Sequence, residues 1–273
     1  MTALKVRGLN LSYGRRQVLR EVALEVAAGE FLVIIGPNGT GKTSLLRAVA
    51  GLVPGAGEIE ILGRPLADYS RRSLARKLAV VEQLTSIDFP FTVAETVLMG
   101  RSPHLGLLEL EGEVDHALAR RAMAFTEVGH LAGRRLDELS GGERQRAVIA
   151  RAICQEPEVI LLDEPTASLD PAHQVRIMDL LERLRRERAL TVIMVSHDLN
   201  LAAMYGSRLA LMGEGRITAV GAPVEVLTVE RLESCYGCRM EVVRSELGGP
   251  LRVHPLPGHR PEIAGSPPGC LSP

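Results

Sequence analysis

The chain begins with two stretches in which apolar and polar positions alternate. Leu4, Val6 and Leu9 belong to the first stretch, and the second runs over residues 18–26. Alternation of this kind is typical of β-strands that bury one face, and Tyr13-Gly14 between the two stretches favours a turn. We therefore predict joined strands near the N-terminus, forming a small antiparallel β subdomain at the edge of a sheet.

Three short apolar runs lie further along the chain, at Phe31–Ile35, 159–162 and Thr191–Val195. Uninterrupted apolar runs of this length are typical of strands that are buried on both faces of a sheet. An amphipathic stretch over residues 172–188 connects the last two runs, and this β-α-β alternation predicts parallel strands. The expected fold class is α/β, built around a mixed sheet.

The segment from about residue 88 to residue 155 has a different character. Spaced apolar positions among charged ones, clearest over residues 113–128, predict a helical subdomain inserted into the core. From Ser245 onward, the last 29 residues contain seven of the chain's 16 prolines and five glycines, so we expect no regular structure there. We accordingly divide the chain into a domain of residues 2–240 and a Pro/Gly-rich extension of residues 241–273.

Composition and charge narrow the range of partners. Hydrophobic residues make up 46% of the chain and charged residues 24%, and 32 basic residues nearly balance 33 acidic ones. Because no excess of positive charge exists, we predict no nucleic-acid partner. No apolar run approaches the roughly 20 residues of a membrane-spanning helix, no secretory signal is evident, and four cysteines are too few for a disulfide framework. These features predict a cytoplasmic location.

A glycine-rich motif follows the first of these apolar runs and precedes a stretch of helical composition. It matches GxxxxGK[ST] with Gly36, Pro37, Asn38, Gly39, Thr40, Gly41, Lys42 and Thr43. In this pattern backbone N–H groups and the positive end of a helix surround phosphate oxygens, while the lysine adds a charge for the β- and γ-phosphates. Thr43, with Ser44 as a secondary candidate, offers a hydroxyl for Mg²⁺. A glycine-rich turn without function is the alternative, but the strand–loop–helix context favours a nucleoside triphosphate site.

Two carboxylates and a histidine follow the other two apolar runs. Because α/β sheets bind ligands at the carboxyl ends of their strands, we expect Asp163 and Glu164 to face the nucleotide. Adjacent side chains of an extended chain point in different directions, so we assign Asp163 to the metal ion and Glu164 to general base catalysis. His197 reaches the same edge, where it can contact a γ-phosphate. A solvated acidic turn and a structural histidine are the alternatives.

A second candidate anion site lies at Ser140, Gly141 and Gly142, just before a helical run. Ser140 and Glu143 fit a capping box, and the exposed N–H groups at such a helix start can bind an anion. Taken alone, however, the motif is better explained as an ordinary capped helix. The residues themselves leave its partner open.

The cysteines carry no assigned chemistry. Cys235 and Cys238 form one CxxC pair, but no second pair or histidine pair completes a zinc site, which favours two small residues near a turn. Cys154 follows apolar residues on a predicted helix, where a free thiol behaves as a small buried hydrophobe.

Taken together, GPNGTGKT, LSGGERQRA and VILLDEP, followed by SLD ending at Asp170 and by His197, resemble the ATPase domains of ABC transporters. The resemblance covers nearly the whole chain, and LSGGERQ is its most specific element. It implies ATP and Mg²⁺ as cofactors. It also implies a head-to-tail homodimer, in which each ATP lies between Lys42 with its loop in one chain and Ser140 with Gly142 of the other.

The resemblance also implies roles that the residue patterns leave open. Tyr13 corresponds to the aromatic side chain that stacks on adenine, and Gln83 to the switch glutamine near Mg²⁺ and the attacking water. Asp170 corresponds to a loop at the dimer contact, and His197 to the γ-phosphate switch. Many relatives have proline where this chain has Glu82, which leaves the backbone before Gln83 less restrained here.

Residues 89–104, together with Tyr236-Gly237-Cys238, resemble a narrower group of ATPases that serve ferric siderophore, haem and cobalamin importers. This implies an ATP-hydrolysing subunit on the cytoplasmic face of the inner membrane, bound there peripherally, which energises uptake of a metal chelate. The implied partners are separate transmembrane permease subunits and an extracytoplasmic substrate-binding protein. The sequence does not distinguish among the chelates.

The alternative is an ABC ATPase that works away from the membrane, in cluster assembly or with DNA. Each motif is present once, and about 97 residues separate Lys42 from Leu139. Chromosome-associated members separate these motifs by long coiled coils, and translation-associated members fuse two ATPase domains, so both are disfavoured. The importer-like segment argues against cluster assembly.

Overall fold

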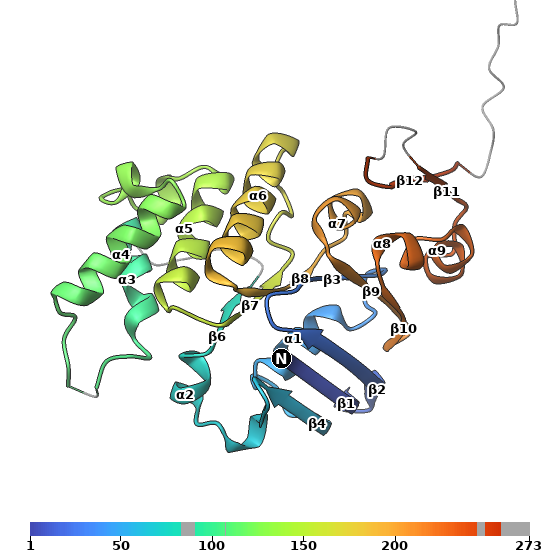
Figure 1. The fold of residues 1–273 in the computed structure, drawn as a ribbon, viewed down its shortest axis with the longest axis horizontal. Helices are drawn as coiled ribbons and strands as arrows, with labels where there is room; N and C mark the ends of the chain where they lie inside the picture. Colours follow the sequence, from blue (N-terminus) through green and yellow to red (C-terminus); the bar gives the residue numbers. More distant parts are fainter. Residues whose placement is uncertain (83–90, 107, 245–248, 258–273) are drawn as a thin grey trace, which may run out of the picture.

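The computed structural model describes residues 1–82, 91–106, 108–244 and 249–257. Figure 1 shows a group of helices on one side, a central sheet, a small antiparallel sheet below it and a C-terminal segment on the far side. Among the described residues no helix has the length and apolar character needed to cross a membrane.

The N-terminal alternation forms the antiparallel sheet that it predicts. Leu4, Val6 and Leu9 are buried against residues of the first helix and of the central sheet, so that this helix lies between the two sheets. The small sheet has the order β2-β1-β4-β5. Its strands are β1 (Thr2–Tyr13), β2 (Arg16–Ala27), β4 (Ala56–Ile61) and β5 (Arg64–Pro65).

The central sheet has six strands in the order β10-β9-β3-β8-β7-β6, all parallel except β10, which confirms a mixed sheet. The three apolar runs form its middle, and every residue of those strands is buried. Because β3, β8 and β7 are adjacent and parallel, the loops that follow them meet at one edge. The strands are β3 (Phe31–Ile35), β6 (Leu78–Val81), β7 (Val159–Asp163), β8 (Thr191–Val195), β9 (Arg208–Gly213) and β10 (Arg216–Gly221).

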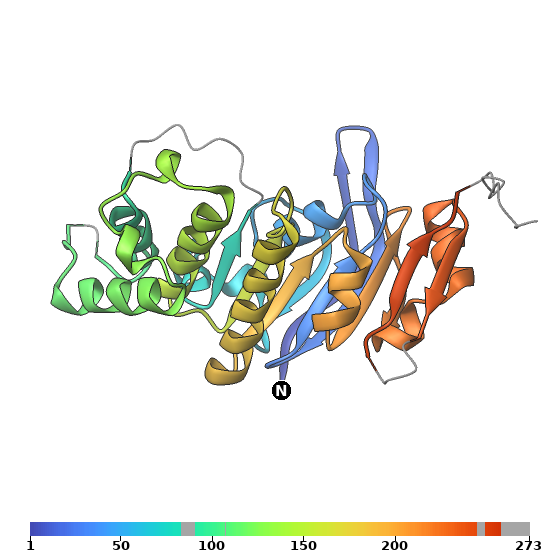
Figure 2. The same ribbon diagram turned by 90° about the horizontal axis from the view of Figure 1, so that it is seen from above.

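Helices cover both faces of the sheet and extend beyond it. The predicted helical group at 88–155 contains α3, α4 and α5, which lie to one side in Figures 1 and 2. The helices up to this point are α1 (Lys42–Val49), α2 (Arg71–Ala75), α3 (Val93–Leu98), α4 (Glu113–Phe125) and α5 (Gly141–Cys154). Those that follow are α6 (Pro171–Arg188), α7 (Leu199–Tyr205), α8 (Pro223–Val226) and α9 (Val229–Tyr236). Short 3₁₀ turns are η1 (Leu66–Asp68), η2 (Met99–Arg101), η3 (Gly129–Leu131) and η4 (Leu136–Glu138).

The C-terminal part departs from the expectation of irregular chain after Ser245. β11 (Met240–Val243) pairs antiparallel with β12 (Arg252–Pro255), so the expectation is wrong for residues 252–255. The physical reason is a tertiary contact: the Asn200 side chain of α7 accepts a bond from the Val253 N–H at 2.8 Å and donates to the Val253 carbonyl at 3.3 Å. The proposed boundary between residues 240 and 241 falls inside β11.

Candidate nucleotide-binding site

The phosphate loop adopts a backbone that only glycine accommodates at two of its positions. Gly36 has φ 147°, and a Cβ there would lie 2.1 Å from the Met212 carbonyl oxygen of β9. Gly41 has φ 100°, and a Cβ there would lie 2.8 Å from a methyl carbon of Leu19 and 3.0 Å from the Val18 carbonyl oxygen. The close approach of neighbouring strands therefore requires glycine at these two positions of the loop.

Lys42 places its ammonium group inside this loop. The side chain is buried, and Nζ donates to the carbonyl oxygens of Gly36 and Pro37, both at 2.8 Å. Burial lowers the pKa of Lys42, while the nearby Glu164 and Asp163 carboxylates oppose that shift. The charge is held at the loop's centre, where phosphate oxygens can replace the carbonyl groups as its partners.

Thr43 and Asp163 meet across the sheet edge. The Thr43 hydroxyl donates to Asp163 Oδ1 at 3.1 Å, and Asp163 is buried. Burial raises the pKa of Asp163, and the bond from Thr43 partly offsets that shift. A hydroxyl and a buried carboxylate fit Mg²⁺, which takes one or two protein oxygens and completes its shell with phosphate oxygens and water.

Glu164 and His197 form a pair beside this hydroxyl and carboxylate. Glu164 has the left-handed φ of 51°, and its N–H donates to the Val195 carbonyl at 3.1 Å, which fixes the turn after β7 to the end of β8. The Glu164 carboxylate is bonded to His197 Nε2. The structure thus brings Lys42, Thr43, Asp163, Glu164 and His197 together at one edge.

The second anion motif is a complete capping box at the start of α5. The Ser140 hydroxyl accepts from the Glu143 N–H at 3.4 Å, while a Glu143 carboxylate oxygen accepts from the Ser140 N–H at 2.9 Å and from its hydroxyl at 2.7 Å. The bonds from the Ser140 hydroxyl and N–H lower the pKa of Glu143. Ser140 and Gly141 are exposed, so the start of this helix is open to a partner.

His173 is a neighbour of this motif that the sequence patterns do not single out. Asp170 caps α6 and accepts from the His173 N–H at 3.0 Å, and its second oxygen is 2.6 Å from His173 Nδ1. The imidazole in turn lies against Gly142. The signal available in the sequence is an aspartate followed by proline and, two residues later, histidine, which is an N-cap pattern.

Tyr13, Gln83 and the cysteines are the other residues that the sequence singled out. Tyr13 ends β1 and is 48% exposed, while Gln83 lies outside the described residues. Cys235 and Cys238 are free thiols, and no metal cluster includes them among the described residues. Cys154 is buried, as expected, and burial raises the pKa of its thiol to about 11.

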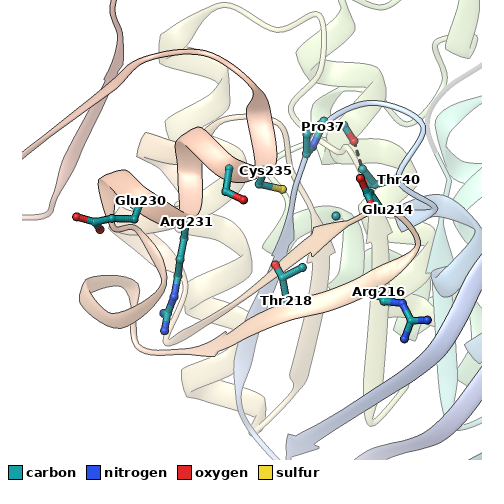
Figure 3. A pocket seen from close by; sticks show the side chains of 10 residues that line it. Pro37, Thr40, Glu214, Arg216, Thr218, Glu230, Arg231 and Cys235 are labelled. Carbon is teal, nitrogen blue, oxygen red and sulfur yellow. Dashed lines mark hydrogen bonds between the residues drawn. The ribbon is translucent and has the colours of Figure 1, made fainter.

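The C-terminal segment contributes to the surroundings of the phosphate loop. A cavity of about 590 Å³ lies between the loop, the β9–β10 turn and α9, as Figure 3 shows. Pro37 and Thr40 line it from the loop, where the Thr40 hydroxyl donates to the Pro37 carbonyl at 2.9 Å. Cys235 lines it from α9 and donates its S–H to the Met212 carbonyl at 3.5 Å. The sequence patterns gave no signal that α9 would lie here.

The fold and this site define an ABC transporter ATP-binding subunit. Residues 19–167 match the ABC transporter family, and the chain belongs to it. Among curated relatives it is 39% identical to the ferric enterobactin transport ATP-binding protein FepC of Escherichia coli (strain K12), over 96% of this chain and 98% of that protein. It is 46% identical to the hemin import ATP-binding protein HmuV of Streptomyces coelicolor, over 91% of this chain and 88% of that protein.

Solved structures of ABC ATPases share the fold. One belongs to an ABC transporter assigned to the metal-chelate type, in an inward-facing conformation, with a TM-score of 0.83 and 29% identity over 94% of this chain and 99% of that one. Another is a dimeric bacterial ABC transporter cassette, with a TM-score of 0.71 and 30% identity over 81% of this chain and 98% of that one. The family binds ATP and couples its hydrolysis to transport, and its importer ATPases work with separate membrane permeases.

Proposed function

We propose that this chain hydrolyses ATP as a head-to-tail homodimer and thereby energises the import of a metal chelate through a separate permease. The observation that carries the ATPase part is the meeting of the Lys42 loop, the Thr43–Asp163 bond and the Glu164–His197 pair at one sheet edge. The named relatives, which serve a ferric siderophore and hemin, support a metal chelate as cargo.

In this proposal each side chain has one task during hydrolysis. Lys42 exchanges its carbonyl partners for the β- and γ-phosphate oxygens, while Thr43 and Asp163 would hold Mg²⁺, which would neutralise phosphate charge. Glu164 accepts a proton from the attacking water, and His197 contacts the γ-phosphate. Glu164 and His197 are bonded to each other in the structure, so in this proposal both become available only when that bond opens.

In this proposal the homodimer supplies a partner for the second anion motif. Ser140 and Gly141 are exposed at the start of α5, where a nucleotide held by the loop of a second chain would meet its N–H groups. Asp170, next to that helix through His173, lies at the same contact in this proposal. Tyr13 and Gln83 keep the roles that the family resemblance implies. Tyr13 would stack on adenine, and Gln83, which lies outside the described residues, would act near Mg²⁺ and the attacking water.

The proposed surface for the permease is a groove between the α1–α2 region and the helical subdomain. Its volume is about 630 Å³, and the end of α1, the segment around α2, η2 and α5 form its walls. Leu52 is 57% exposed and Met99 37% exposed, which leaves apolar side chains uncovered in the free chain. The groove takes a cytoplasmic segment of the permease, while a substrate-binding protein delivers the chelate on the other side of the membrane.

Replacing the proposed general base tests the ATPase assignment. We expect Glu164→Gln to lower the hydrolysis rate by about 100-fold or more while ATP binding is retained, because only proton transfer is lost. Glu158→Gln serves as the matched control, since Glu158 is an exposed partner of Lys77 away from the site. The rate is measured as phosphate release and binding with a fluorescent ATP analogue. Hydrolysis by Glu164→Gln at the wild-type rate would contradict the assignment.

Isolation from native membranes tests the transport assignment. The tagged chain is extracted with mild detergent, and its partners are identified by mass spectrometry. We expect a polytopic permease, and the ligand of any accompanying binding protein names the cargo. If only soluble partners are recovered, the ATPase works away from the membrane and the import assignment fails.

A further inference from the structure

An exposed apolar surface lies outside the nucleotide site and outside the groove. Leu108, Leu110 and Val114 are 96%, 84% and 71% exposed, more than any other large apolar side chain in the described residues except Met1. Single exposed apolar residues are ordinary, but three within seven residues form a patch of the kind that marks an interaction site. The patch spans the end of the connection between η2 and α4 and the first turn of α4.

Carboxylates alternate with these apolar side chains. Glu109, Glu111 and Glu113 stand between them, and residues 108–119 contain no lysine or arginine. None of the three forms an ion pair with a described residue, although Glu109 accepts a bond from the Gly106 N–H at 2.7 Å. We name Leu108, Glu109, Leu110, Glu111, Glu113 and Val114 the Leu–Glu surface. It presents apolar area and unpaired negative charge together.

The Leu–Glu surface is anchored beside the groove. Pro103 lines the groove, and its carbonyl oxygen accepts bonds from Arg72 Nε at 2.9 Å and Arg76 Nε at 2.8 Å, both from the α2 region. Arg72 also donates to the Leu105 carbonyl. Figure 1 shows this connection reaching the side of the molecule on which α2 lies. The segment that leads to the Leu–Glu surface therefore starts at the wall of the groove.

We propose that the Leu–Glu surface binds a basic cytoplasmic loop of the permease, and so helps this ATPase to select its own permease; this rests on the function proposed above. Cytoplasmic loops of polytopic membrane proteins are enriched in lysine and arginine, which complements three unpaired carboxylates. The leucines supply the apolar area that such a loop covers. The carboxylates and the leucines together therefore fit a partner segment that carries both basic and apolar side chains.

Two other occupants fit the surface less well. The cytoplasmic leaflet carries negative charge, so a membrane surface would repel the three glutamates even though it would accept the leucines. A second copy of the chain, docking the same patch against itself, would place like charges opposite one another. Only a partner with positive charge satisfies both halves of the surface.

The test compares three variants of the full chain in native membranes. Leu108→Ser with Leu110→Ser removes the apolar part, and Glu109→Lys with Glu111→Lys reverses the charge. Val224→Ser with Glu230→Lys is the matched control, because Val224 is 44% exposed and both residues lie in the α8–α9 region. We expect the first two variants to co-isolate at least about tenfold less permease than wild type, with unchanged melting midpoints, and the control to match wild type. Raising the salt concentration should weaken wild-type binding but not that of the charge-reversed variant.

A photo-cross-linker at position 110 identifies what lies on the surface. We expect it to capture a peptide from a lysine- or arginine-rich cytoplasmic loop of the co-isolated permease. Capture of lipid or of a second copy of the chain, or full permease recovery with both surface variants, overturns the inference while leaving the import function intact. If wild type itself recovers no permease, the proposed function fails and the inference fails with it.

Discussion

Gly142 is packed so tightly against His173 that the two residues act as one contact between α5 and α6. A Cβ at position 142 would lie 2.2 Å from His173 Cδ2, whereas a Cβ at Gly141 would lie 3.3 Å from the flexible end of Leu169. The imidazole has little freedom to move, because its Nδ1 is 2.6 Å from Asp170 Oδ2. The start of the second anion motif is therefore held in place by the segment that follows the Glu164 turn.

We expect Gly142→Ala to lower the free energy of unfolding by about 1–3 kcal/mol, because the added methyl group displaces a bonded imidazole. Gly141→Ala is the matched control and should change stability by less than about 0.5 kcal/mol, since Leu169 can turn away. Urea denaturation of the nucleotide-free chain measures both. Adding His173→Ala to Gly142→Ala should recover part of the loss, and a loss unchanged in the double variant would show that His173 is not its cause.

Arg101 connects several elements of the helical subdomain. It lies in η2 and is buried, and it donates to Asp115 of α4 at 2.9 Å, to the Cys154 carbonyl at the end of α5 at 2.9 Å and to Glu156 at 3.0 Å. A charge buried this far from water is stable only while its partners remain. One side chain thus links η2, α4 and the end of α5.

We expect Arg101→Met to lower the free energy of unfolding by about 3 kcal/mol, because the change removes the positive partner of Asp115 and leaves a buried carbonyl without its donor. Lys77→Met breaks the exposed pair with Glu158 instead and should cost less than about 1 kcal/mol. Denaturant unfolding compares the two variants. Equal losses of unfolding free energy in the two variants would mean that burial of the Arg101 pair adds nothing to its contribution to stability.

The contact between Arg101 and Asp115 should make the free energy of unfolding depend on pH. The bonds from Arg101 and from the Gly112 N–H hold the pKa of Asp115 below its ordinary value. An unfolded aspartate titrates near about 3.9, so this stabilisation is complete above that pH and is lost as the pH falls through the lower pKa of the folded state. We expect the stability difference between wild type and Asp115→Asn to shrink in urea titrations from about pH 6 to about pH 3. A difference that stays constant over this range would contradict the assignment.

If each nucleotide site combines residues of two chains, one chain alone contains no complete catalytic site. Lys42→Ala removes the charge of the phosphate loop, and Ser140→Arg blocks the second motif, so each variant alone should be inactive. In a mixture, a dimer containing one chain of each kind has both defects in one site and none in the other. We expect mixing to restore up to about a quarter of the wild-type hydrolysis rate, the statistical yield of intact sites. No restoration would place both motifs of a site in the same chain.

Much of this arrangement could be predicted because the signals are local. The run Phe31–Ile35, the glycines of the loop and the capping box at Ser140 each depend on neighbours in sequence, and each is found as expected. The contacts that could not be predicted are long-range. Asn200 pairs with Val253 across more than 50 residues, and no composition signal marks either partner. The roles of Tyr13, Gln83 and the catalytic residues stay predictions.

The arginines of the α2 region suggest how members of such a family could diverge. Arg72 and Arg76 hold the connection that leads to α4 by donating to the carbonyl oxygens of residues 103–105. Every residue type has a backbone carbonyl oxygen, so these bonds do not depend on the side chains at those positions. Mutations can therefore change the side chains of this segment while its path across the molecule is conserved. After gene duplication, a copy could acquire a new permease by altering a few exposed residues, with its catalytic centre inherited unchanged.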